Sequence, residues 1–296
     1  MIDLSKLPPP DLLVEVDFED IYAAKLERFK TLYPEYTAAL ESDAAVKLLE
    51  LAAYDEMMSI ARINDAARAS MLAYAEKADL DNRAADFGVS RLLIREGDAE
   101  ATPPVDPLWE DDERLRYRCQ MAPEGLSVAG PSGAYKFHAL SASGDVLDVA
   151  VEGASSTGPA PPPPGTVRVW LLDRRGDGVA GVDVLAVVAA ALNDENVRPI
   201  CDTVEVLPAR PLRFQVDATI EWQDGGKQAS GGLEAARERL NAMLAERRRI
   251  GALVPRSAID AALHCPGVDR VVIHAPLEDI HCQVGEYPLC DGERLR

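Results

Sequence analysis

The chain has 296 residues, a length that suggests about two domains, and a formal net charge of −19. Because so acidic a chain repels phosphate and carries no basic arm or stripe, we expect no direct binding of nucleic acid. Its apolar stretches are too short to span a bilayer, and its first ten residues lack the apolar core of a signal peptide. We therefore expect no membrane insertion, and synthesis in a reducing cytoplasm.

The first part of the chain predicts helices. One helix is expected over Phe18–Tyr33, and a much longer one from a cap at Ser42 to about Glu76. The long helix has apolar side chains at steps of three or four residues, and its alanines and methionines suit close packing against irregular partners. We therefore predict a partner interface on this stripe, formed by Val46, Leu49, Ala53, Met57, Ile60, Ile63, Ala67 and Met71. A short helix over Asp79–Phe87 then ends at Gly88.

The middle of the chain changes from helix to strand. Glu96–Pro107 is predicted to be a polar, proline-bearing connector, and the proline run within Ser155–Gly165 to be a stiff, exposed loop that cannot join a sheet. Around these segments we expect helices near Glu110–Met121 and Ser132–Ser141, strands over Val146–Val151 and Val167–Leu172, a helix over Val182–Asn193 and a strand near Thr203–Leu207.

The last third predicts a second unit of strands and helices. Strict alternation of apolar and polar residues over Leu212–Trp222 is typical of a half-buried antiparallel strand. After it we expect a turn at Gly225 and Gly226, a helix over Leu233–Arg249, a short helix after Pro255 and a closing strand over Val268–His274.

The fold class is therefore α+β, with an N-terminal helical region followed by two small α+β modules whose sheets are mainly antiparallel. We expect a helical assembly domain over residues 1–98, a connector with short helices over 99–142, a first α+β module over 143–209, and a second module with the tail over 210–296.

A glycine pattern between a predicted strand and a predicted helix could cradle a phosphate. G-x-G-x-x-G is the fingerprint of dinucleotide-binding loops, and an acid lies downstream where a ribose would bind. Two carboxylates beside the loop would repel a pyrophosphate, and the preceding strand is expected to be the second arm of a hairpin, so a plain polar turn is favoured. The glycines are Gly176, Gly178 and Gly181, the downstream acid is Glu205, and the carboxylates are Asp173 and Asp177.

Other reactive residues do not form a recognisable catalytic set. Ser132 lacks the spacing of a nucleophile elbow and is expected to cap a helix, and Cys119 with His138 lacks a third, orienting residue. The acidic run Glu110–Glu113 is favoured by a helix dipole without any metal. The C-terminal third lacks the short ligand pairs of zinc sites, although it contains His264, Cys265, His274, His281, Cys282 and Cys290.

Four segments, spread over most of the chain, carry a family signature. They are Asp3–Ile21, Leu80–Leu92, Glu113–Val151 and Ala245–Val271. In these segments, and in this order, the chain resembles the baseplate J-like proteins, wedge components of contractile phage tails and tailocins. The tail after Val271 does not match that pattern.

This resemblance implies a structural wedge protein of a tail baseplate, assembled in the host bacterial cytoplasm and present in the virion or tailocin particle. It implies that two copies pair, and that the pairs close a ring around the central hub proteins and support the sheath. It also implies that the N-terminal helices bundle with a tail protein I-like wedge subunit, while other surfaces meet a lysozyme-like sheath-initiating subunit.

No enzyme activity, cofactor or metal is expected on this interpretation. The alternative is a nucleotide- or metal-dependent enzyme that uses the 176–181 glycine loop or the C-terminal histidines and cysteines. A second alternative is an adaptor in the baseplate of a related injection machine.

Overall fold

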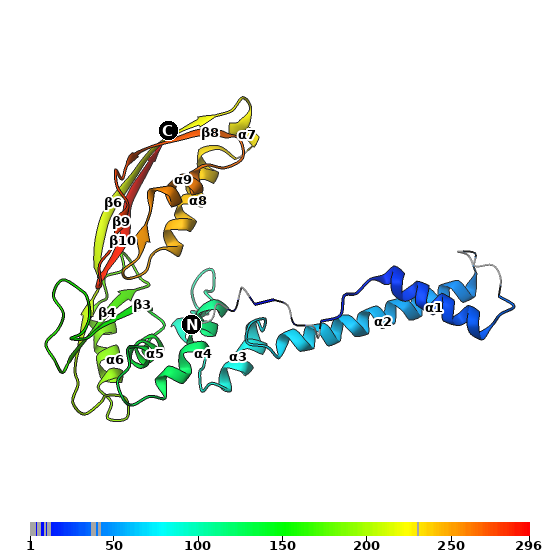
Figure 1. Ribbon diagram of the computed structural model, residues 1–296, viewed down its shortest axis with the longest axis horizontal. Coiled ribbons are helices and arrows are strands. Elements are labelled where there is room, and N and C mark those ends of the chain that lie inside the picture. Colours follow the sequence, from blue (N-terminus) through cyan, green and yellow to red (C-terminus); the bar gives the residue numbers. More distant parts are fainter. Residues whose placement is uncertain are drawn as a thin grey trace. The chain divides into compact units, whose positions relative to one another are not determined.

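The computed structural model describes residues 4, 7, 8, 10, 13–36, 40, 43–229 and 231–296. The chain divides into two compact units, one of residues 1–90 with 111–120 and the other of residues 91–110 with 121–296. The fold class is α+β, as the sequence predicted: the first unit is helical, and the second combines strands with helices (Figure 1). In the described part of the chain no helix combines the length and the apolar character needed to cross a lipid bilayer.

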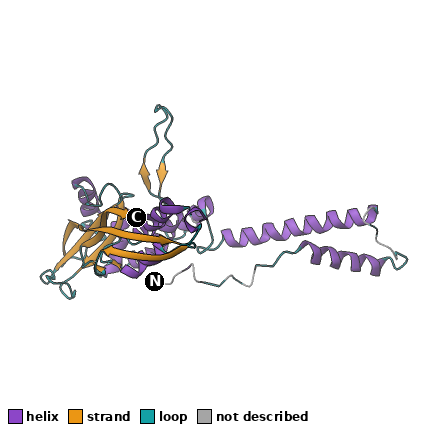
Figure 2. Ribbon diagram, turned by 90° about the horizontal axis from the view of Figure 1, so that it is seen from above, coloured by secondary structure: helices purple, strands orange, loops and turns teal. Residues whose placement is uncertain are grey.

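Two helices form most of the first unit. α1 (Phe18–Leu32) starts after Asp17, whose carboxylate accepts two backbone hydrogen bonds, and α2 (Ala44–Ala69) starts after Asp43, whose carboxylate accepts one. The first predicted helix is confirmed to within one residue. Ser42, the expected cap of the long helix, lies outside the described residues. α1 lies along the N-terminal half of α2 (Figure 1, Figure 2).

The long helix ends earlier than the sequence predicted, at Ala69 rather than near Glu76. Beyond it the chain turns, and the guanidinium of Arg116 donates to the carbonyls of Leu72 (2.8 Å) and Ala75 (2.7 Å). These bonds satisfy carbonyls that a continuing helix would have used. An arginine distant in sequence, rather than a local helix breaker, therefore stabilises the turn that ends α2.

The next two helices differ from expectation at their ends. α3 (Lys77–Ala85) begins before the predicted start at Asp79, and its Lys77 N–H donates to the carboxylate of Asp112 (2.9 Å). α4 (Asp112–Gly125) continues past the predicted end at Met121 and contains Pro123. Because the first turn of a helix needs acceptors for its free N–H groups, a carboxylate from another helix can start α3 earlier than its own sequence indicates.

A β-hairpin contains the predicted connector. β1 (Leu93–Arg95) and β2 (Leu108–Trp109) pair antiparallel, and an isolated bridge between Asp98 and Val105 continues the pairing toward the tip. The polar, proline-bearing connector predicted over Glu96–Pro107 forms the part of this hairpin beyond its two strands. The strands, of three and two residues, are too short to show an alternating pattern, which is why the sequence did not reveal them. In Figure 2 this hairpin projects away from the strands and helices of its own unit.

The first module of the second unit contains a three-stranded sheet of order β3-β4-β5. β3 is antiparallel to β4, as expected for a hairpin, and β5 is parallel to β4. The elements are α5 (Ser132–Ala142), β3 (Val146–Glu152), β4 (Thr166–Asp173), α6 (Val182–Leu192) and β5 (Thr203–Pro208). All five predicted elements are therefore present, with no end shifted by more than one residue.

Two local expectations in this module are wrong. Ser132 is the first residue of α5 rather than its cap; the cap position belongs to Pro131, whose φ of −65° already suits entry into a helix. Pro162 is buried, so the loop between β3 and β4 is not wholly exposed. A proline ring is apolar and donates no N–H, so it can be buried without leaving a donor unpaired.

The second module is built on β6 (Arg210–Trp222), which lies between β8 (Val268–Ala275) and β10 (Glu286–Leu295). The alternation predicted for β6 is confirmed by the buried residues Phe214, Val216, Ala218 and Ile220. The sheet is mixed, however, because β6 is antiparallel to β8 but parallel to β10. β8 is therefore not the closing strand: β10 comes from the tail that carried no family signature.

Helices cover one face of this sheet (Figure 1). They are α8 (Gly232–Glu246) and α9 (Arg256–Leu263), and a short pair of strands, β7 (Leu253–Val254) with β9 (Ile280–His281), lies beside them. α8 ends before the predicted Arg249, and a short helix α7 (Gly226–Ala229) stands where a turn was expected. The core contains Val216, Ala218, Ala236, Leu240, Val254, Ile259 and Leu263, each at most 1% exposed.

Candidate assembly surface

The stripe predicted as a partner interface lies mainly on the inner side of α2. Val46 and Ala53 are 3% and 0% exposed, and Leu49, Met57, Ile60 and Ala67 are half-buried. Ile63 is 63% exposed, and the half-buried Met71 lies beyond the end of α2. The structure thus brings most of the stripe to one face, but part of that face is already covered within the chain.

Two segments cover the stripe. α1 packs along α2, and the Lys25 ammonium pairs with the Glu56 carboxylate between the two helices. The extended segment before α1 is held by Asn64 of α2, whose amide accepts from Val14 N–H (3.1 Å) and donates to Val14 C=O (2.7 Å). Asn64 is 7% exposed. Nothing in the sequence singled it out, because a single asparagine inside an apolar pattern gives no sign of its partner.

A second apolar face of α2 remains exposed. Leu48, Leu51, Tyr54 and Met58 are 66%, 57%, 50% and 48% exposed, and their spacing of three or four residues places them along one side of the helix. α1 itself has no fully buried residue, and Leu32 at its end is 76% exposed. Exposed apolar patches are one of the features by which interaction surfaces are recognised.

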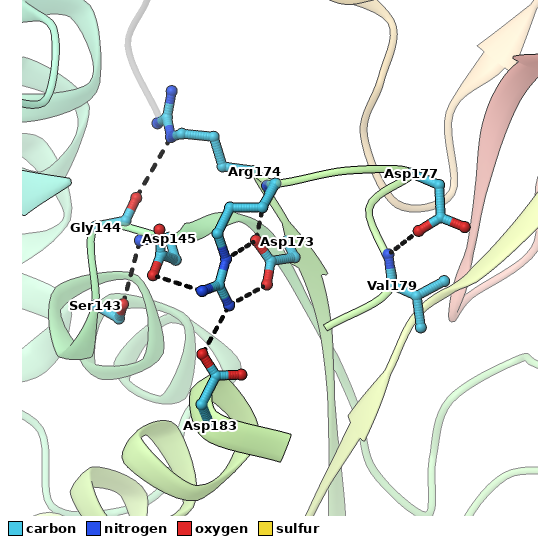
Figure 3. A network of polar contacts seen from close by, with 9 residues as sticks. Ser143, Gly144, Asp145, Asp173, Arg174, Asp177, Val179 and Asp183 are labelled. Atoms are coloured by element: carbon cyan, nitrogen blue, oxygen red, sulfur yellow. Dashed lines mark hydrogen bonds and ion pairs between the residues drawn. The ribbon is translucent and has the colours of Figure 1, made fainter. Parts of the chain in front are cut away.

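The glycine loop after β4 is organised around an arginine. The guanidinium of Arg175 contacts three carboxylates: Asp173 at 2.9 Å, Asp183 at 3.0 Å and Asp145 at 3.5 Å. Asp173 is only 2% exposed and also accepts the Arg175 N–H at 2.7 Å. The hydrogen bond from the Arg175 guanidinium to Asp183 lowers the pKa of Asp183. Figure 3 shows the carboxylates of Asp145, Asp173 and Asp183 converging on one point beside the loop.

Polar groups of this loop are engaged within the protein. Arg248 donates to the Gly176 carbonyl (3.0 Å), and Tyr287 donates to the Asp177 carbonyl (2.9 Å). The Val179 N–H donates to the Asp177 carboxylate (3.3 Å). A Cβ at Gly178 would lie 2.8 Å from the Arg248 side chain, so the loop is packed against the second module. The geometry supports a polar turn joining the two modules.

Carboxylates of the acidic run at residues 110–113 accept hydrogen bonds from backbone N–H groups. Glu110 is 2% exposed and accepts the Leu92 N–H at 3.0 Å, and Asp111 accepts the Arg114 N–H at 2.8 Å. Cys119 is buried, and His138 Nε2 lies 3.2 Å from the carbonyl of Gly125. The structure therefore gives local roles to the acidic run and to His138.

The C-terminal histidines and cysteines are spread over several elements. Cys265 is buried, and the Cys290 thiol donates to the Gly292 carbonyl at 3.3 Å. Burial raises the pKa of the Cys282 thiol to about 11. Among the residues that the structure describes, no three His, Cys, Asp or Glu side chains are grouped so that they could hold a metal ion.

A cavity of about 420 Å³ lies where the two modules of the second unit meet. Its polar walls are paired with one another: Arg168 with Glu205 at 3.2 Å, and Trp170 Nε1 with Glu152 at 3.3 Å. The Arg210 guanidinium lies 5.5 Å from the Trp170 ring. The cavity thus contains a self-satisfied polar set rather than an open cluster of reactive groups.

The chain thus combines a helical unit with an α+β unit. Two family models match the chain: the baseplate J-like N-terminal domain over residues 41–98, and the baseplate J-like central domain over residues 127–208. The chain is also 41% identical over 302 residues to baseplate protein J of Escherichia phage P2, covering 100% of this chain and 97% of that protein. It therefore belongs to the baseplate J-like family.

Proposed function

We propose that the chain is a wedge subunit of a contractile-tail baseplate, in the virion or a tailocin, where it acts as a structural protein. The observation that carries the proposal is the match to baseplate protein J over the full length of both proteins. A baseplate protein works through contacts with other baseplate proteins, and the exposed apolar residues of the first unit suit such contacts.

Two copies pair in this proposal, and the pairs close a ring around the central hub proteins and support the sheath. The helices of residues 1–98 form the assembly domain and bundle with a tail protein I-like wedge subunit. The interface stripe predicted from the sequence takes part through its accessible residues, and the contact extends onto Leu48, Leu51, Tyr54 and Met58. Residues 99–142, 143–209 and 210–296 supply further surfaces, one of which meets a lysozyme-like sheath-initiating subunit.

A helical unit of this kind has a physical reason to bind a partner. Two packed helices enclose little volume, and no residue of α1 is fully buried. A partner helix laid on the outer face of α2 would remove four large side chains from water, each worth about 1.5–3 kcal/mol when fully buried. This gain is comparable to the free energy that two proteins lose when association restricts their motion.

The proposal is tested in the phage that encodes the chain. Its gene is deleted and supplied again with a tag, and purified particles are imaged with a label on the tag. We expect label at the baseplate in the complemented particles, and tails without baseplates in the deletion strain. Normal baseplates without the gene, or label elsewhere on the particle, would contradict the proposal.

A further inference from the structure

The hairpin between β1 and β2, residues 92–110, is a built structure, which we call the arm. Its base is closed by the Glu110 N–H donating to the Leu92 carbonyl (3.0 Å), and by the Arg91 guanidinium donating to the Glu110 carbonyl (2.7 Å). Nearer the tip, Asp98 and Val105 exchange two backbone hydrogen bonds of 2.8 and 2.9 Å. The Asp98 carboxylate also accepts the N–H groups of Glu100 and Ala101.

The arm leaves several large apolar side chains exposed to water. Leu93 and Trp109 are direct partners across the strands and are 38% and 48% exposed, and Leu108 and Val105 are 46% and 37% exposed. Two-stranded hairpins are marginally stable by themselves in water. Tryptophan is among the residues that contribute most to protein interfaces. The arm therefore has the features of a docking element.

Its charge restricts what it can dock into. Between residues 93 and 109 there is one arginine, Arg95, against four acids, Glu96, Asp98, Glu100 and Asp106, which gives a net charge of −3. Two arms pressed against each other across a two-fold axis would repel. The binding surface must combine apolar contact with positive charge.

The same chain carries such a surface at the end of α8. An open groove of about 300 Å³ is lined by Glu246, Arg247, Arg249, Ala252 and Leu253. Leu253 is 41% exposed, and Arg247 donates to its carbonyl at 2.9 Å, which fixes one wall. Within the part of the chain that the structure describes, the Arg249 guanidinium makes no ion pair. The groove lies in a run of three arginines, Arg247–Arg249, in a chain of net charge −19.

We propose that the arm of one copy docks into the arginine-lined groove of a second copy. Each copy would present one arm and one groove, so the contact is head to tail, and repetition around an axis closes a ring when the rotation allows it. This inference deepens the proposed ring of copies around the hub and rests on it. The acidic, apolar arm and the basic, apolar groove are complementary in both charge and chemistry.

Charge reversal tests the docking without disturbing the fold. Glu96→Lys, Glu100→Lys and Asp106→Lys together make the arm basic and spare Asp98, which orders the tip. Arg249→Glu reverses an exposed side chain of the groove. We expect either change to weaken self-association in sedimentation experiments about ten-fold or more, and the combination in one chain to restore it. Unchanged self-association in both variants, or loss without rescue in the combination, would overturn the proposal.

Mixing separates a head-to-tail contact from other modes of pairing. The arm variant keeps a normal groove, and the groove variant keeps a normal arm. The mixture should associate as the wild type does, with the two variants alternating, because the normal arm meets the normal groove and the basic arm meets the acidic groove. Neither variant should associate alone. Complexes that form equally in each variant alone would show that the copies pair through another surface, which would leave the baseplate role intact and refute the arm.

Cross-linking in the assembled particle provides the positional readout. Leu108→Cys and Leu253→Cys are combined in a Cys201→Ser background, since Cys201 is exposed whereas the raised pKa of Cys282 limits its reactivity at neutral pH. We expect a disulfide between copies at 108 and 253. Ile200→Cys, which replaces a residue 99% exposed, is paired with Leu253→Cys as the control and should give none. A 108 cysteine that reacts only with another protein, or with its own chain, would contradict docking into a second copy.

Discussion

The hydroxyl of Tyr287 in β10 donates to the backbone carbonyl of Asp177 in the glycine loop, at 2.9 Å. Tyr287 is fully buried and packs with Leu172 and Ala209 where the two modules meet. A strand from the end of the chain thereby holds a loop that precedes it by more than a hundred residues. The glycine pattern is therefore best understood as a junction between modules.

The two glycines of that loop should differ in their tolerance of alanine. Gly176 has φ +53° and open space around its Cβ position, whereas at Gly178, with φ +106°, a Cβ would lie 2.8 Å from Leu172 Cδ1 and from Arg248 Nη2. We expect Gly176→Ala to cost about 1 kcal/mol of unfolding free energy, and Gly178→Ala roughly 2–3 kcal/mol. Urea unfolding of both variants measures this difference. Equal costs would mean that the loop is not packed as described.

Removal of the Tyr287 hydroxyl should weaken the junction, mostly below pH 10. Burial raises the pKa of Tyr287 to about 12, from an ordinary value of 10.0. Its contribution is therefore complete below pH 10 and is lost as the pH rises toward 12, because the unfolded chain releases the proton first. We expect Tyr287→Phe to lower the unfolding free energy by about 0.5–1.5 kcal/mol at pH 8, and to flatten the loss above pH 10. If the unfolding free energy of Tyr287→Phe fell as steeply above pH 10 as that of the wild type, Tyr287 would not be the group responsible for that loss.

Arg175 should contribute more to the unfolding free energy than Arg174 does. Arg175→Gln leaves the buried Asp173 carboxylate without its guanidinium, which we expect to cost about 1–3 kcal/mol, reduced because Arg175 is itself half exposed. Arg174, whose Nε makes one long contact of 3.4 Å to the Gly144 carbonyl, is the matched control, and Arg174→Gln should cost less than half as much. Thermal unfolding of the pair decides the comparison.

The inner face of α2 should be required for assembly into the baseplate, but not for the folding of the second, α+β unit. Met57→Asp with Ile60→Asp places two carboxylates where α1 covers α2, and burying unpaired charges costs several kcal/mol each. We expect loss of co-purification with the tail protein I-like partner, while tryptophan fluorescence of the second unit remains native. All three tryptophans, Trp109, Trp170 and Trp222, lie in that unit. Retained partner binding would exclude the helical unit as the assembly surface.

The sequence was informative where a pattern is local. The alternation of β6 and the turn-bounded helices α5, α6 and α9 follow from residues close together in the chain, and the structure contains all of them. The sequence did not predict β10, because Pro288, Asp291 and Gly292 interrupt its alternation of apolar and polar residues. Its partner β6 is also far away in the sequence, near the start of the same module. Pairing between distant segments can order a strand whose own residues have little preference for one.

The candidate assembly surface could be predicted only in part, because it too depends on contacts between segments far apart in the sequence. Periodicity identified the apolar stripe of α2 but could not indicate which face α1 would cover. Leu48 and Leu51 belong to the opposite face and were not included in the predicted interface. The arm was missed because its pairing rests on backbone hydrogen bonds, such as that between Asp98 and Val105, rather than on hydrophobic alternation.

The most direct test of the account is the incorporation of an outer-face variant into particles. Leu48→Asp with Leu51→Asp changes residues 66% and 57% exposed, so the isolated chain should keep its wild-type circular dichroism. Ile200→Asp, at a residue 99% exposed in the second unit, is the control. In a phage lacking the gene, we expect the control to restore baseplates and the double variant to be absent from purified particles. Particles that carry the double variant at wild-type copy number would contradict the claim that the helical unit builds this protein into the baseplate.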